Sequence, residues 1–139
     1  MSDLMRLDQE LARKAAELLG DTVKPDLRAR MRSLPVMIQT SGLAATVAFL
    51  LSRAKGDDRE NRDWKTAELI LSDAAATAGI QITAGMPKSS LKTVADATPA
   101  KYVLAETRAI QLAIWLSRLA DALVERPASP DSPDSPEGS

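Results

Sequence analysis

The chain has 139 residues, with 18 basic and 19 acidic side chains, and it contains neither cysteine nor histidine. That length fits one compact domain. The missing residue types exclude disulfides, thiol nucleophiles, imidazole acid–base catalysis and the usual zinc sites. Ala and Leu dominate the apolar residues and aromatics make up only 3% of the chain, so the composition favours helices over strands.

The first half of the chain predicts three helical segments. The first has Ser2 as a possible N-cap, apolar residues every three or four positions, and Gly20 just past its end. The second begins at Pro25 and runs up to the residue before Pro35, where we expect a helix end or a kink. The third covers residues 35–54 and should be central in the fold, because its own apolar side chains extend around most of the helix. Gly42 lies within it and costs about 1 kcal/mol relative to Ala, so we expect a neighbouring helix to cross closely there.

The second half predicts a loop, two helices and a connector. Residues 56–63 contain no apolar side chain and are expected to form a solvated loop. A helix follows over residues 64–78 and ends at Gly79. Residues 79–99 are expected to be an irregular connector with one short helical turn near residues 91–94. The longest helix should have Thr98 as N-cap and Pro99 at its first position, and should end near Val124.

The last segment is a low-complexity stretch of Pro, Ser and Asp, which cannot bury enough apolar surface to offset its ordering entropy. We therefore predict an all-α, compact bundle of about five to six helices over residues 1–125 and a disordered tail over residues 126–139. No apolar run approaches the roughly 18 residues that cross a bilayer, and no leader pattern precedes the first helix. A cytoplasmic protein without a membrane partner is the expectation.

The residues offer little support for catalysis. An acidic cluster in the loop could hold a hard cation, but arginines interleave with it and the calcium-loop spacing is missing, so a solvated loop is the better interpretation. The cluster consists of Asp57, Asp58, Glu60 and Asp63. Gly85–Ser89 resembles the end of a phosphate-binding loop but lacks the spaced first glycine and a preceding strand. We predict no enzyme activity, no metal and no cofactor.

One charge asymmetry remains. Between Thr22 and Lys55 the chain carries six basic residues against the single acid Asp26. Arg28 and Arg32 lie one helical turn apart and share a face, which Lys24 continues if the helix begins early enough. Such a stripe can neutralise phosphates, although a solvated helix face with scattered arginines is the simpler interpretation from the residues alone, and the few aromatics argue against base stacking.

Two segments resemble a known family when they are taken together. The first reads LPVMIQTSGL from Leu34 and continues into AFLLSRAK from Ala48; the second runs from Tyr102 into WLSRLA at Trp115. In order and approximate spacing they are similar to the small-subunit family of type III-B CRISPR Cmr effector complexes. The similarity covers residues 28–55 and 102–123 well. This sequence departs from the family pattern at Ser41, Ser117 and Leu119.

The resemblance implies a non-catalytic structural subunit that packs along the backbone subunits of the Cmr complex and contacts RNA through a basic face. Its implied partners are the backbone and large subunits, neighbouring copies of itself, guide RNA and target RNA. Sequence specificity would come from guide pairing, because contacts to phosphates carry no sequence information. The residues expected to face RNA are Lys24, Arg28, Arg32, Gln39, Arg53, Lys55 and Arg118.

An alternative function stays open. In it the chain is a helical protein–protein adaptor without direct RNA contact, in which the basic residues only keep the surface hydrated. Phe49, Trp64 and Trp115 would then serve as core or interface anchors, the commonest role for aromatic residues at helical spacing. Charge reversal at Arg28 and Arg32 separates the two functions, because only the first predicts a loss of RNA affinity.

Overall fold

The computed structural model describes residues 2–54 and 59–124, and the regular elements in these ranges are all helices. They are α1 (Ser2–Leu19), α2 (Pro25–Ser41), α3 (Leu43–Arg53), α4 (Arg62–Ala78), α5 (Pro87–Ala95) and α6 (Pro99–Leu123). The predicted all-α bundle is confirmed, at the upper end of the expected helix number. None of the described helices combines the length and apolar character that crossing a membrane requires. The predicted disordered tail and Lys55 lie outside the described residues.

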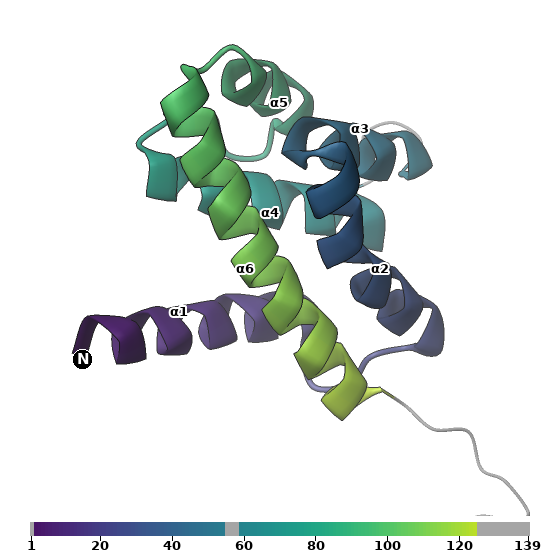
Figure 1. Cartoon of the computed structure of the whole chain (residues 1–139). Helices are drawn as coiled ribbons and strands as arrows, with labels where there is room; N and C mark the ends of the chain where they lie inside the picture. Colours follow the sequence, from purple (N-terminus) through teal and green to yellow (C-terminus); the bar gives the residue numbers. More distant parts are fainter. Residues whose placement is uncertain (1, 55–58, 125–139) are drawn as a thin grey trace, which may run out of the picture.

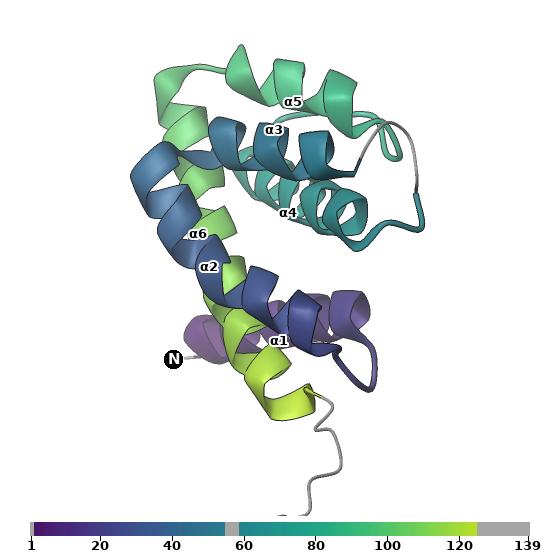
Figure 2. The ribbon, with the colours of Figure 1, turned by 90° about the vertical axis from the view of Figure 1, so that its right-hand side faces the viewer.

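The 25-residue helix α6 organises the bundle. It packs against α1, α2 and α4, while α3 packs on α4, and α5 contacts both α3 and α4. In Figure 1, α6 runs diagonally across the molecule, with α1 across its lower half and α5 near its upper end. Figure 2 shows α3, α4 and α5 stacked together, with α2 leading into this group from below. The segment before α2 is joined to the end of α6, because the Val23 N–H donates to the Leu123 carbonyl at 3.0 Å.

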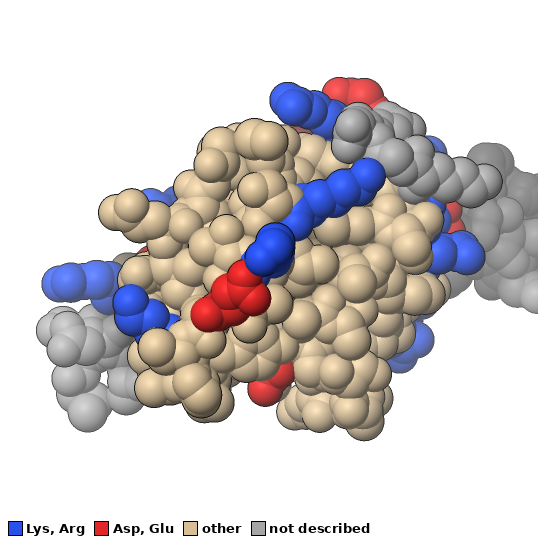
Figure 3. Space-filling view, turned by 90° about the horizontal axis from the view of Figure 1, so that it is seen from above, with Lys and Arg blue, Asp and Glu red and all other residues tan. Residues whose placement is uncertain are grey.

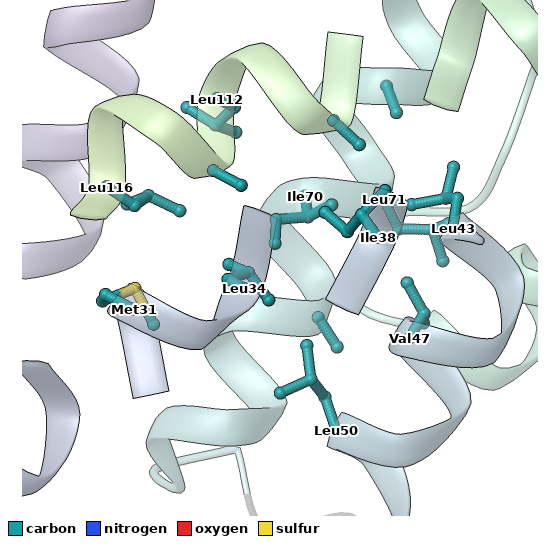
Figure 4. Close-up of a cluster of buried hydrophobic side chains, with 14 of the residues drawn as sticks. Met31, Leu34, Ile38, Leu43, Val47, Leu50, Ile70, Leu71, Leu112 and Leu116 are labelled. Atoms are coloured by element: carbon teal, nitrogen blue, oxygen red, sulfur yellow. The ribbon is translucent and has the colours of Figure 1, made fainter. Parts of the chain in front are cut away.

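The core lies between α2, α3, α4 and α6 (Figure 4). Small residues let these helices approach closely, because the distance between helix axes depends on the side chains at the contact. Ala105, Ala109 and Ala113 on α6 are all fully buried. The large side chains that fill the remaining space are Met31, Leu34, Ile38, Leu43, Val47, Leu50, Ile70, Leu71, Leu112 and Leu116.

The predicted helix end at Pro35 is wrong, because α2 continues through the proline to Ser41. An interior proline costs about 3 kcal/mol, since it removes a hydrogen bond and crowds the preceding turn. Met31, Leu34 and Ile38 lie on one helical face that spans the proline, and all three are at most 1% exposed. Burying three such side chains contributes more than the proline costs.

The predicted single helix over residues 35–54 is also wrong, because the chain turns at Gly42 between α2 and α3. Gly42 has φ of +93°, a conformation that side chains with a Cβ rarely adopt. The neighbouring helix at Gly42 is α6, which reaches it with the side chains of Glu106 and Tyr102 and not with a closely crossing backbone. The Glu106 carboxylate accepts from Leu43 N–H at 2.9 Å and the Tyr102 hydroxyl from Ala44 N–H at 2.9 Å, so α6 caps the start of α3.

Gly42→Ala should therefore destabilise the protein by about 2–3 kcal/mol, because the new Cβ is strained by its φ and would lie 3.3 Å from Glu106 Oε2. Gly79→Ala is the matched control. Gly79 also has a positive φ, but nothing lies within 4 Å of its Cβ position, so only the strain of a left-handed alanine, about 1 kcal/mol, should be lost. Urea unfolding of both variants tests the comparison. An equal loss at the two positions would contradict the crowding of Gly42 by the Glu106 side chain.

The remaining boundaries follow local signals with two exceptions. The Asn61 side chain accepts from Asp63 N–H, Gly79 ends α4 in the left-handed conformation, and the Thr98 hydroxyl accepts from Lys101 N–H. The predicted connector is wrong in part, because it contains the nine-residue helix α5. The predicted solvated loop is wrong at Asp63, which is buried and accepts from Arg30 Nε at 3.2 Å.

A buried ion pair joins three helices. Arg108 on α6 donates from Nε to Asp73 Oδ2 at 2.7 Å and from Nη2 to Asp73 Oδ1 at 3.0 Å. The same Nη2 donates to Glu10 Oε1 of α1 at 3.2 Å. The hydrogen bond with Asp73 raises the pKa of Arg108, and the side chains of both residues are at most 5% exposed. The position of α1 is thus tied to α4 and α6 by charge as well as by apolar packing.

Candidate nucleic-acid interface

Four of the seven predicted RNA-facing residues lie along one face of α2. Lys24 is the N-cap of the helix and Pro25 its first residue. Because an α-helix has 3.6 residues per turn, the positions of Lys24, Arg28, Arg32 and Gln39 fall on one side of it. We call these four residues the α2 basic stripe. Its three cations are concentrated at the amino-terminal half of the helix.

The position of Lys24 runs against helix stability. The amino-terminal end of a helix carries partial positive charge that fades within the first turn, so a cation at the N-cap costs about 0.3–1 kcal/mol, whereas Arg32, two turns into the helix, is hardly affected. Asp26 is the only acid in the first turn of α2. The cations and the helix end therefore add to one positive potential, which favours an anion at this surface.

Asp121 on α6 partly balances the stripe. Its Oδ1 accepts from Arg28 Nε at 2.8 Å and lies 3.8 Å from Arg32 Nε. The hydrogen bond from Arg28, together with the charges of both arginines, lowers the pKa of Asp121 against an opposing effect of burial. All three side chains are substantially exposed, so the pairs contribute little stability. Since a guanidinium has five N–H donors, both arginines keep donors for another anion.

Arg118 lies near Asp121 on α6. It is exposed on α6, three residues before Asp121 and therefore nearly one turn away. Gln39 is exposed near the other end of α2, about 10 Å along the helix from Arg32. The α2 basic stripe thus has its cations toward one end of the helix and the neutral Gln39 toward the other.

Arg53 lies in a different setting. It lines an open cleft of about 810 Å³ formed by the start of α2, the end of α3 and the turn before α4. Lys24 lines the same cleft, so this residue links Arg53 to the α2 basic stripe. The cleft also holds the ion pair between Arg62 and Asp26. Its lining contains acids as well as cations, which makes the α2 basic stripe the more strongly positive surface.

Two arginines that the sequence did not distinguish act inside the fold. Arg30 pairs with Asp63, and its guanidinium lies 5.0 Å from the centre of the Phe49 ring. Arg108 is the buried residue of the ion pair described above. A charged residue next to Ala105 and Ala109 on the core face was the available signal for Arg108, but its partner on α4 is 35 positions away. Among the predicted anchors, Trp64 is buried and Phe49 is 39% exposed.

The acidic cluster is only partly described. Asp57 and Asp58 lie outside the described residues, while Glu60 and Asp63 line the cleft. Over residues 2–54 and 59–124, no group of three or more acidic side chains is placed to hold a metal ion.

Comparison with known proteins identifies the family. The family model described as CRISPR-associated protein (Cas_Cmr5) matches residues 6–123, which covers all of α6 and most of α1. No curated protein and no solved structure matches the chain significantly. The match includes both segments on which the resemblance rested and the whole α2 basic stripe. The chain therefore belongs to the Cas_Cmr5 family, the small-subunit family of type III-B CRISPR Cmr complexes.

Proposed function

We propose that this protein is a non-catalytic structural subunit of a Cmr complex that contacts guide or target RNA through the α2 basic stripe. Family membership implies association with other Cmr subunits. The observation that carries the RNA contact is the alignment of Lys24, Arg28 and Arg32 on one exposed face. Exposed arginines with unused donors suit phosphate contacts that do not depend on sequence.

The absence of catalysis is part of the proposal. The sequence contains no histidine and no cysteine, which removes the usual acid–base groups and thiol nucleophiles. The family is one of structural small subunits. The subunit would supply surface and positive charge, while guide pairing supplies specificity. A cytoplasmic location accompanies this role.

A second surface suits protein partners. Figure 3 looks onto the end of the molecule that α5 and the start of α6 form, and most of its visible surface is uncharged. Val103 and Leu104 on α6 are 58% and 55% exposed. Such a surface fits contact with the backbone subunits, with large subunits or with neighbouring copies. This observation also favours the alternative of an adaptor without RNA contact.

The test is the affinity of the isolated chain for labelled single-stranded RNA across a series of salt concentrations. Each phosphate contact to a single strand contributes about 0.7 to the slope of log Kd against log salt. Three or four contacts therefore predict a slope of about 2–3. The sequence of the RNA should matter little. Binding that does not respond to salt would contradict the RNA contact, and no binding either alone or in the assembled complex would favour the adaptor.

A further inference from the structure

The chain leaves α6 beside the start of the α2 basic stripe. Val124, the last described residue, forms an isolated backbone bridge with Val23, and Val23 also donates to the Leu123 carbonyl. Val23 immediately precedes Lys24. In Figure 1 the lower end of α6 accordingly lies next to the segment that leads into α2. Residues 125–139, which we call the acidic segment, therefore begin within a few residues of the stripe.

The acidic segment is opposite in charge to the stripe. It contains four acids and one base, whereas the stripe has three cations. Three of the acids recur at every third position, in SPDSPDSPE from Ser129.

The acidic segment is also long enough to span the stripe. Lys24 and Gln39 are separated by 15 residues of helix, or about 22 Å. Fifteen residues of extended chain reach at least twice that distance, at about 3 Å per residue.

We propose that the acidic segment lies across the α2 basic stripe in the free subunit and competes there with RNA phosphates. Asp121 gives the local precedent, since an acid near the end of α6 already pairs with Arg28 and Arg32. Attachment to the same chain raises the effective concentration of the segment to the millimolar range, so weak pairs suffice. The competition rests on the proposed RNA contact, whereas the docking of the segment does not.

The absence of cysteine allows a direct test in the full chain. Ser135→Cys would carry a nitroxide label, and the amide signals of α2 would be recorded by NMR. We expect signals from residues 24–39 to broaden at about 50 mM salt and to recover well above about 200 mM. The same labelled chain with Asp131→Asn, Asp134→Asn and Glu137→Gln should show little broadening.

RNA affinity is the second measurement. The charge-neutral variant of the acidic segment should bind single-stranded RNA about 3–10-fold more tightly at about 50 mM salt, with the difference shrinking as salt rises. The matched control is Asp8→Asn, Glu17→Gln and Asp96→Asn, which changes net charge equally on α1 and beyond α5. It should change affinity less than the segment variant.

The outcomes separate this inference from the proposed function. RNA binding without broadening of α2 signals would overturn the inference and leave the function standing. Broadening without RNA binding would support the docked segment and overturn the RNA contact. Broadening that arises only from a labelled second copy mixed with unlabelled protein would place the segment on a neighbouring molecule and overturn the intramolecular contact.

Discussion

Replacing Arg108 by methionine is expected to lower the free energy of unfolding by about 3–5 kcal/mol, because the change leaves the buried Asp73 carboxylate without its partner. Asp73 accepts two hydrogen bonds from Arg108, and its side chain is only 4% exposed. Glu10 would lose its bond to the same guanidinium, so the attachment of α1 should weaken as well. Urea unfolding followed by circular dichroism measures the loss.

Two further variants show whether the loss comes from an unpaired charge. Arg108→Met combined with Asp73→Leu should recover much of the stability, since apolar residues often replace a buried ion pair at little cost. Arg118→Met on the same helix is exposed and should change stability by no more than about 0.5 kcal/mol. A loss below about 1 kcal/mol for Arg108→Met alone would contradict a buried, fully paired Arg108.

Reversing both arginines of the α2 basic stripe is expected to weaken RNA binding strongly. Arg28→Glu with Arg32→Glu should raise Kd by about 10–100-fold at low salt, equivalent to about 1.4–2.8 kcal/mol. The slope of log Kd against log salt should fall by about 1.4, because two contacts of about 0.7 each are lost. Fluorescence anisotropy with a labelled single-stranded RNA measures both quantities.

Two controls separate a local effect from a change of net charge or fold. Arg6→Glu with Arg13→Glu alters net charge equally on exposed positions of α1 and should reduce affinity much less. Asp121→Asn removes the acid that pairs with Arg28 and Arg32, so it should tighten binding instead. If Asp121→Asn weakened binding as much as the reversal does, the stripe would not be the contact surface. Circular dichroism checks that each variant stays folded.

Local sequence signals correctly predicted helix ends that a few neighbouring residues determine. Thr98 with Pro99 marked the start of α6, and Gly79 marked the end of α4, because capping is decided by a few neighbouring residues. The predicted helix end at Pro35 followed from an equally local rule and was wrong. Burial on both sides of the proline decides the outcome there, and burial depends on α6, far away in the sequence.

The candidate site was likewise predictable where spacing within one helix decides it, and not where distant segments meet. The spacing of Arg28 and Arg32 within one helix, with Lys24 at its N-cap, was enough to place them on one side. The pairing of Arg28 with Asp121 joins residues 93 positions apart, and no local pattern encodes it. Arg53 likewise meets Lys24 only because the ends of two helices meet at the cleft.

The most direct test uses the assembled Cmr complex. Complexes reconstituted with wild-type subunit or with the Arg28→Glu/Arg32→Glu variant should contain the same subunits, because the proposed protein-facing surface lies elsewhere. Target-RNA affinity would then be measured across a salt series for both. A weaker affinity and a flatter salt dependence in the variant complex are the predicted result. Identical affinity and slope in fully assembled complexes would contradict an RNA-facing α2 and leave the subunit as a protein adaptor.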